Sequence, residues 1–216
     1  MAELRPVALP PAERTVGQLV AESVRFYGDH FWPSLRLGLA PAIAAVVGAN
    51  LSRRTTLVVW PTAFAAVLSA TFVYASVLVL GRRPSSKRLV VAWLAGWVAF
   101  APVVFLVGAY ILPGLAWIVA FALLVPVLVA EDVAAAAAVS RAWRLARADL
   151  VHQAGSLLTL GIVVFLTQAV LAFVLRDFGG TTEWVTYALA SVVVSPLFVI
   201  GVALLYVDQA ARAGVQ

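Results

Sequence analysis

Long apolar runs separated by short charged segments dominate the chain, and their lengths are close to the roughly 20 residues that a helix needs to cross a bilayer. We therefore predict six membrane-spanning helices, at about residues 31–51, 57–80, 91–112, 114–130, 151–175 and 184–207. As a single helix, the uncharged run from Leu89 to Ala130 would reach about 63 Å, twice a hydrocarbon core. It must fold back, and Pro113-Gly114 is the expected turn.

Two other segments combine the helical period with one apolar and one polar face. In residues 132–150 the apolar face comprises Val139, Trp143, Ala146 and Leu150, and the polar arc comprises Ser140, Arg141, Arg144 and Arg147. Residues 15–30 show a similar pattern, and the spacing of Thr15 and Gln18 fits a capping box. We expect both segments to be amphipathic interfacial helices on the cytoplasmic face of the membrane.

Composition points to the same class of protein. Of the 216 residues, 63% are hydrophobic and only 12% are charged, and the mean hydropathy is +1.02. Soluble domains are typically about 45–50% apolar and about 25% charged. We therefore expect an all-α integral membrane bundle, with one domain over residues 15–216. Residues 1–14 carry three prolines and mixed charge, so they should form an irregular cytoplasmic tail. They lack the apolar core of a signal peptide.

The basic residues predict how this bundle is oriented. In a six-span arrangement, Arg53, Arg54 and Arg176 lie on one side, and the other twelve of the 15 basic residues lie with both chain ends. Because cytoplasmic loops are enriched in Lys and Arg, both termini should be cytoplasmic. A tight outer turn is expected at residues 52–56. Its two arginines are discordant, and a re-entrant first segment is the alternative explanation.

The net charge of +5 and the pI near 10.2 raise the question of what the basic residues bind. They lie beside the spans and no aromatic-basic readout motif accompanies them, so we expect anionic lipid headgroups and no nucleic acid. The candidate lipid- or partner-contacting residues are Arg82, Arg83, Lys87, Arg88, Arg141, Trp143, Arg144 and Arg147. A membrane protein partner or a second copy of the chain is the other expected contact.

The sequence offers little for catalysis. It contains no cysteine, which excludes disulfides and thiolate chemistry, and no phosphate-binding loop, GxSxG or HExxH motif. His30 and His152 lie near Asp29 and Asp149, but these four would act together only within about 5 Å of one another. Two imidazoles are too few to indicate a zinc site. We expect no catalytic residue, metal or cofactor, and no enzymatic activity.

Prolines lie within every predicted span except the fifth, at Pro41, Pro61, Pro102, Pro126 and Pro196. Proline interrupts helices, and interrupted helices act as hinges in transporters, although membrane helices also tolerate them as ordinary structure. Coupled transport requires ionisable groups at depth, and between the two interfaces the predicted spans contain only Arg36, since His152 is at the inner end of the fifth span. We therefore expect a non-catalytic accessory or scaffold protein, with a small-solute transporter or permease subunit as the alternative.

Three stretches carry a resemblance to a known family: ESVRFYGDHFWPSLRLGLAP, LVAEDVAAAAAVSRAWRLARADL and SPLFVIGVALLYVDQAAR. Together they resemble the membrane domain fused to some glycerophosphoryl diester phosphodiesterases and found in stand-alone bacterial proteins. The residues at comparable places are Glu131, Ser140, Trp143, Arg144, Tyr206, Asp208 and Arg212. The resemblance covers nearly the whole chain and implies a membrane fold without hydrolase activity. An abundance of Ala, Val and Arg is typical of GC-rich bacteria, so we expect a bacterial inner membrane location.

Overall fold

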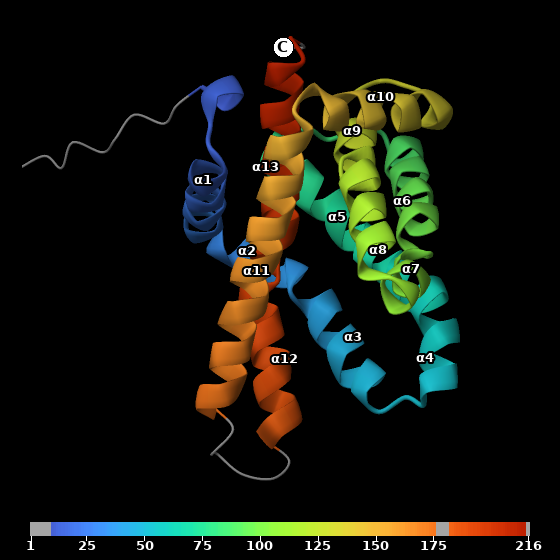
Figure 1. The fold of residues 1–216 in the computed structure, drawn as a ribbon, viewed down its shortest axis with the longest axis vertical. Coiled ribbons are helices and arrows are strands. Elements are labelled where there is room, and N and C mark those ends of the chain that lie inside the picture. The colour runs from blue at the N-terminus through green and yellow to red at the C-terminus, as the bar shows by residue number, and fades with distance from the viewer. Residues whose placement is uncertain (1–9, 176–181, 215–216) are drawn as a thin grey trace, which may run out of the picture.

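The computed structural model describes residues 10–175 and 182–214, which form a bundle of helices joined by short turns (Figure 1). In chain order these are η1 (Pro11–Glu13), α1 (Val16–Asp29), α2 (Phe31–Leu37), α3 (Leu39–Ala49), α4 (Arg53–Val59), the π-helix η2 (Trp60–Phe64), α5 (Ala65–Leu80), α6 (Ser86–Phe100), α7 (Val103–Ala109), α8 (Ile111–Phe121), α9 (Leu124–Ala130), α10 (Ala135–Ala148), α11 (Leu150–Leu175), α12 (Thr182–Val194) and α13 (Pro196–Arg212).

Six stretches of the described residues are long and apolar enough to cross a membrane, as the sequence predicts. They are Phe31–Gly48, Arg53–Leu80, Ser86–Val107, Ile111–Ala130, Leu150–Leu171 and Ala188–Arg212. At 1.5 Å per residue, the 26 residues of α11 reach about 39 Å, which exceeds the roughly 30 Å of a hydrocarbon core. The coarse prediction is confirmed: the described residues are helical, and six of the helical stretches are long and apolar enough to cross a membrane.

Two predicted connections are wrong in detail. The turn expected at Pro113-Gly114 lies at Tyr110, and Pro113 falls in the first turn of α8, where its missing N–H leaves no helical bond unmade. Residues 52–56 begin a helix instead of forming a turn. The Ser52 hydroxyl accepts a hydrogen bond from the Thr55 N–H and caps α4, so the actual connection is only Asn50–Ser52. The loop expected between the fifth and sixth spans falls mostly on residues outside the described ranges.

Each of the five prolines lies at or near a change in helical structure, and the span without proline is a single regular α-helix. Helix pairs meet at or shortly before the proline in four spans, at the α2–α3, α6–α7, α8–α9 and α12–α13 junctions. In the second span, Pro61 lies inside the π-helical segment η2. A proline removes one N–H and crowds the preceding turn of the helix, which accounts for breaks at these places. Helix α11 contains no proline and is continuous, which agrees with this explanation.

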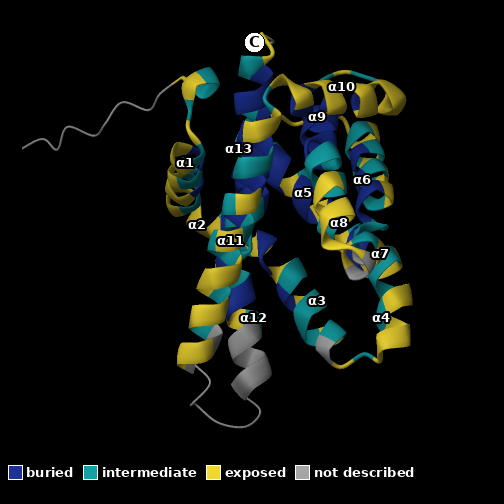
Figure 2. Ribbon diagram, viewed as in Figure 1, coloured by how far each residue is buried: buried dark blue, intermediate teal, exposed yellow. Residues whose placement is uncertain are grey.

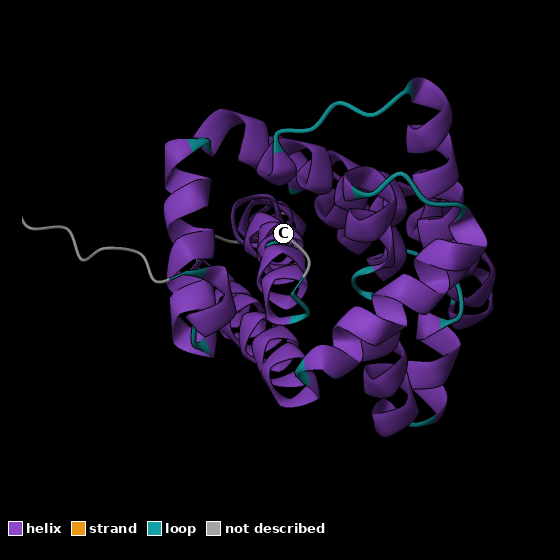
Figure 3. Cartoon of the chain, turned by 90° about the horizontal axis from the view of Figure 1, so that it is seen from above, coloured by secondary structure: helices purple, strands orange, loops and turns teal. Residues whose placement is uncertain are grey.

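Helix α13 occupies the centre of the bundle. It packs against α1, α5, α11 and η1, and 67% of the most apolar part of its span is buried, against 17% for the span of α11 (Figure 2). In Figure 3 the C-terminus lies inside the ring formed by the other helices. A helix buried on all sides belongs to the core, so the remaining elements are arranged around α13.

Close helix approach holds the rest of the bundle together. Gly38 lies against α12 so tightly that a Cβ placed there would collide with the Val192 carbonyl group. Tryptophans also join helices: the indole N–H groups of Trp93 and Trp97 donate to the carbonyls of Ala66 and Pro61. Such small residues and interhelical hydrogen bonds are the usual means of association for membrane helices.

Helix α10 lies crosswise over one end of the bundle, which we call the α10 end (Figure 1). The side of α10 that packs on the bundle is formed by Ala138, Ala142, Leu145 and Ala146. The predicted apolar face is therefore rotated: Val139 and Trp143 are 42% and 40% exposed. Small alanines face the protein because they allow close packing, and the larger apolar residues lie beside this contact. The predicted capping box of α1, formed by Thr15 and Gln18, is confirmed.

Candidate functional site

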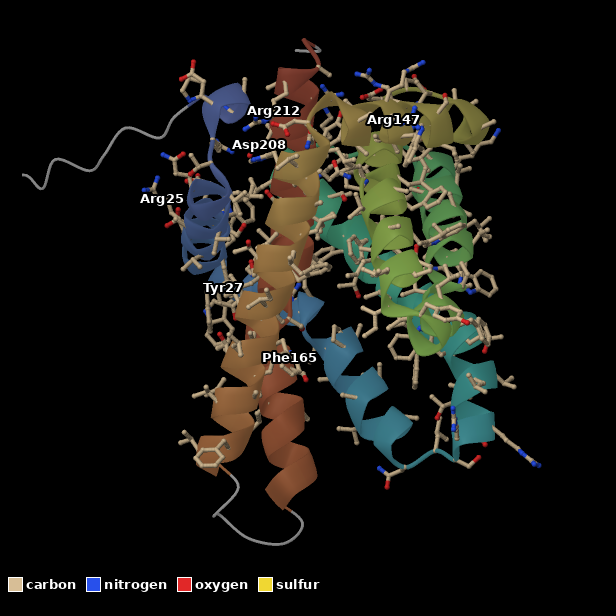
Figure 4. All side chains as sticks on the ribbon, in the orientation of Figure 1. Arg25, Tyr27, Arg147, Phe165, Asp208 and Arg212 are labelled. Carbon is tan, nitrogen blue, oxygen red and sulfur yellow. The ribbon has the colours of Figure 1, made fainter. Side chains whose placement is uncertain are left out.

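Polar side chains gather around the last two turns of α13, at the α10 end (Figure 4). After an apolar run, the helix presents Tyr206, Asp208, Gln209 and Arg212. The side chains of Asp208 and Gln209 are fully buried. Because an unpaired polar group in a protein interior costs free energy, the partners of these side chains decide what this part of the molecule can do.

Asp208 is paired with an arginine from the opposite end of the chain. Arg14, between η1 and α1, donates from Nη1 to Asp208 Oδ1 over 3.0 Å. Only 13% of the Arg14 side chain is exposed, and none of the Asp208 side chain. Solvent ions therefore screen this pair only weakly, and it attaches the N-terminal segment to the central helix.

Arg212 makes the second set of contacts. Its Nη1 donates to Asp149 Oδ2 over 2.7 Å, and its Nη2 donates to the backbone oxygen of Arg14 over 2.6 Å. Asp149 connects α10 to α11, and its Oδ1 accepts the His152 N–H, which caps α11. We call Arg14, Asp149, His152, Asp208 and Arg212 the α13 clamp, because together they join η1, α11 and α13.

His152 lies within the clamp without a full set of partners. Its Nε2 is 3.8 Å from Asp208 Oδ2, which is beyond hydrogen-bonding distance. Neither of these two atoms has a hydrogen-bond partner in the described part of the chain. These two atoms are therefore among the polar atoms of the clamp that its own contacts leave without a partner.

A second polar cluster lies on another side of α13 and is centred on Glu131, at the end of α9. The Arg141 Nε donates to both carboxylate oxygens of Glu131, over 3.2 and 3.1 Å, and the Tyr206 hydroxyl donates to Oε1 over 3.1 Å. Arg82 donates to the Ala130 carbonyl beside it. A groove of about 520 Å³ opens next to Glu131, with Tyr206 and Arg82 in its wall.

The eight residues predicted to contact lipid or a partner divide into two groups. Arg82, Arg88 and Arg141 are engaged within the protein, because Arg88 is paired with Asp132 and the other two belong to the Glu131 cluster. The prediction that Arg141 lies on an outward polar arc is thus wrong. Arg83, Lys87, Trp143, Arg144 and Arg147 are exposed and make none of these contacts, and Arg82 is exposed as well despite its bond to the Ala130 carbonyl.

The exposed cations have no anionic partner among the described residues. Arg147 instead lies over the ring of Trp143, with its guanidinium carbon 4.4 Å from the ring centre, a cation–π contact. Arg83 and Lys87 precede or begin α6, and Arg144 is on α10, so all four cations are at the α10 end. We call Arg83, Lys87, Arg144 and Arg147 the free cations.

The possible histidine–aspartate cluster does not assemble. His30 is exposed at the end of α1, where its ring stacks on Phe26. His152 contacts Asp208 and Arg212 instead. In the described part of the chain, no group of three or more acidic, histidine or cysteine side chains is placed to hold a metal ion.

No protein-family model matches the chain, and no curated protein or solved structure is detectably similar to it. The resemblance to the membrane domain of glycerophosphoryl diester phosphodiesterases therefore stays a prediction from the sequence motifs.

Proposed function

We propose that the chain is a non-catalytic scaffold of a bacterial inner membrane that organises anionic lipid, alone or together with a membrane partner protein. Its α10 end would lie at the cytoplasmic surface. The observation that carries the proposal is the division of the cations there. Arg14 and Arg212 of the α13 clamp and Arg141 of the Glu131 cluster are paired with carboxylates within the protein, whereas the free cations are not.

The surroundings of the free cations support headgroup binding over a purely structural role. Exposed Trp143 and Val139 accompany Arg144 and Arg147 on α10. Tryptophan is enriched where a membrane protein meets the interface, and each cation near an anionic surface contributes about 1 kcal/mol. Both described chain ends also lie at the α10 end, since Arg14 contacts Asp208 and Arg212. An orientation with both termini in the cytoplasm would bring these cations to the inner leaflet.

The test is the lipid preference of two matched double variants. Arg144→Ala with Arg147→Ala removes two free cations, and Arg53→Ala with Arg54→Ala removes the same charge from the start of α4. In bilayers, electron spin resonance of spin-labelled phosphatidylglycerol and phosphatidylcholine gives the ratio of their association constants with the protein. We expect the first variant to lower this ratio, by up to about fivefold per arginine at its site. The control should leave it near the wild-type value, and equal ratios in both variants would refute the proposal.

A small-solute transporter is the second candidate, favoured by the helix breaks in four spans and the π-helical segment in a fifth. Polar residues between the spans would then line the path. Cysteines placed singly at Gln168 and Ser195 would be shielded from a water-soluble thiol reagent when the solute is present. Labelling that no candidate solute alters would count against transport.

A further inference from the structure

An apolar groove of about 630 Å³ opens on the outer surface of the bundle between α6, α8 and α10. The side chains that line it include Leu94, Val98, Trp117, Phe121, Ala136 and Val139, and none of its lining residues is charged. Leu94 and Val98 are 42% and 72% exposed, although they belong to a stretch apolar enough to cross a membrane. The groove therefore faces the surroundings of the bundle and not its interior.

A single free cation marks the mouth of this groove. Lys87 is one turn before Val91 on α6, and the positions 87, 91, 94 and 98 share one helix face. Lys87 therefore continues the groove-lining face of α6 toward the α10 end, the direction in which a long side chain on this helix points. The neighbouring Arg88 cannot serve in its place, because it is paired with Asp132.

We propose that this groove holds an acyl chain of one anionic phospholipid whose phosphate contacts Lys87. The inference rests on the proposed function and names a specific site for it. An apolar slot with one unpaired cation at its membrane-surface end complements a lipid with a negative headgroup. Within a bilayer every tail is already in an apolar medium, so the slot alone distinguishes no lipid. The preference must come from Lys87, at about fivefold for a single cation.

Trp117 provides an internal reporter of occupancy, because it lines the groove and its indole N–H donates to the Ala99 carbonyl, which fixes the ring. Lipids brominated on the acyl chain quench tryptophan fluorescence on contact. The quenching that belongs to Trp117 is the difference between the wild-type chain and Trp117→Phe, both in bilayers of graded composition. We expect brominated phosphatidylglycerol to quench this fraction at about one fifth of the mole fraction that brominated phosphatidylcholine requires.

Three variants test the site. Lys87→Gln should remove the preference for phosphatidylglycerol and leave quenching intact. Ala136→Phe should fill the groove and abolish Trp117 quenching by both lipids. Ala137→Phe, at the adjacent exposed position of α10 outside the groove, should behave as wild type. The inference is overturned if the two lipids quench wild-type protein equally, if Ala136→Phe and Ala137→Phe behave alike, or if cross-linking shows a second copy covering the groove.

The outcome is separable from that of the proposed function, because Arg144 and Arg147 do not line the groove. Loss of headgroup preference in the Arg144/Arg147 variant, combined with no effect of Lys87→Gln on Trp117, would reject the groove site alone. If Lys87→Gln removes the lipid preference at Trp117 and the Arg144/Arg147 variant keeps its headgroup preference, lipid binding by the broader basic surface is rejected and the groove site is retained.

Discussion

Replacing Asp208 with asparagine removes the buried charge of the α13 clamp while keeping the side-chain size. Arg14, only 13% exposed, would then lose its counter-ion in a place where solvent replaces it poorly. Breaking a buried ion pair from one side typically costs 3–5 kcal/mol. Because Arg14 keeps some contact with solvent, we expect a loss at the lower end of this range, about 3 kcal/mol. This corresponds to a decrease of about 6–12 °C in the unfolding midpoint for a chain of this size.

The matched control is Asp132→Asn, which removes an aspartate from an exposed pair with Arg88. The Asp132 side chain is 87% exposed, so this loss should stay below about 1 kcal/mol. Thermal unfolding of both variants in the same detergent, followed by size-exclusion chromatography, compares them directly. Addition of Arg14→Gln to Asp208→Asn should recover part of the stability, since the uncompensated charge is then gone. If Asp208→Asn and Asp132→Asn lower the midpoint equally, the reasoning about the buried clamp is refuted.

The same thermal assay checks two further predictions. Tyr206→Phe deletes a hydrogen bond to the Glu131 carboxylate and should cost about 1.5–3 kcal/mol; an unchanged midpoint would show that this bond is not made in the membrane protein. Gly38→Ala drives a Cβ into the Val192 carbonyl and should destabilise by about 1–3 kcal/mol or more, because backbone and not a flexible side chain is in its way. Gly161→Ala is its control, since nothing lies within 4 Å of that Cβ, and it should be neutral or stabilising.

Features set by neighbouring residues were predictable from the sequence. Apolar runs separated by charges located six spans, and prolines located the interruptions, because both effects act within one or two helical turns. The Thr15–Gln18 capping box is equally local and is present. The turn at Tyr110 is also a local feature, although it was predicted three residues later in the chain. Pro113-Gly114 is a turn signal in isolation, but proline is also accepted in the first turn of a helix, where it is found.

Features set by contacts between distant residues were not predictable in this way. Arg14 and Asp208 are 194 positions apart, and nothing in either local segment indicates the other. Arg141 appeared to lie with two other arginines on an outward arc, yet Glu131 holds it within the bundle. The available signal was Asp208 itself, a charged residue continuing an apolar helix. Such a residue needs a buried partner, although the sequence does not say which one.

The proposal that the α10 end binds anionic lipid is tested most directly by mass spectrometry of the intact protein released from native membranes with its bound lipids. We expect enrichment of anionic phospholipid on the wild-type chain relative to the surrounding membrane. That enrichment should decrease when Arg144 and Arg147 are replaced by alanine and persist when Arg53 and Arg54 are replaced. Bound lipids in the proportions of the bulk membrane, unchanged by either double substitution, would contradict it.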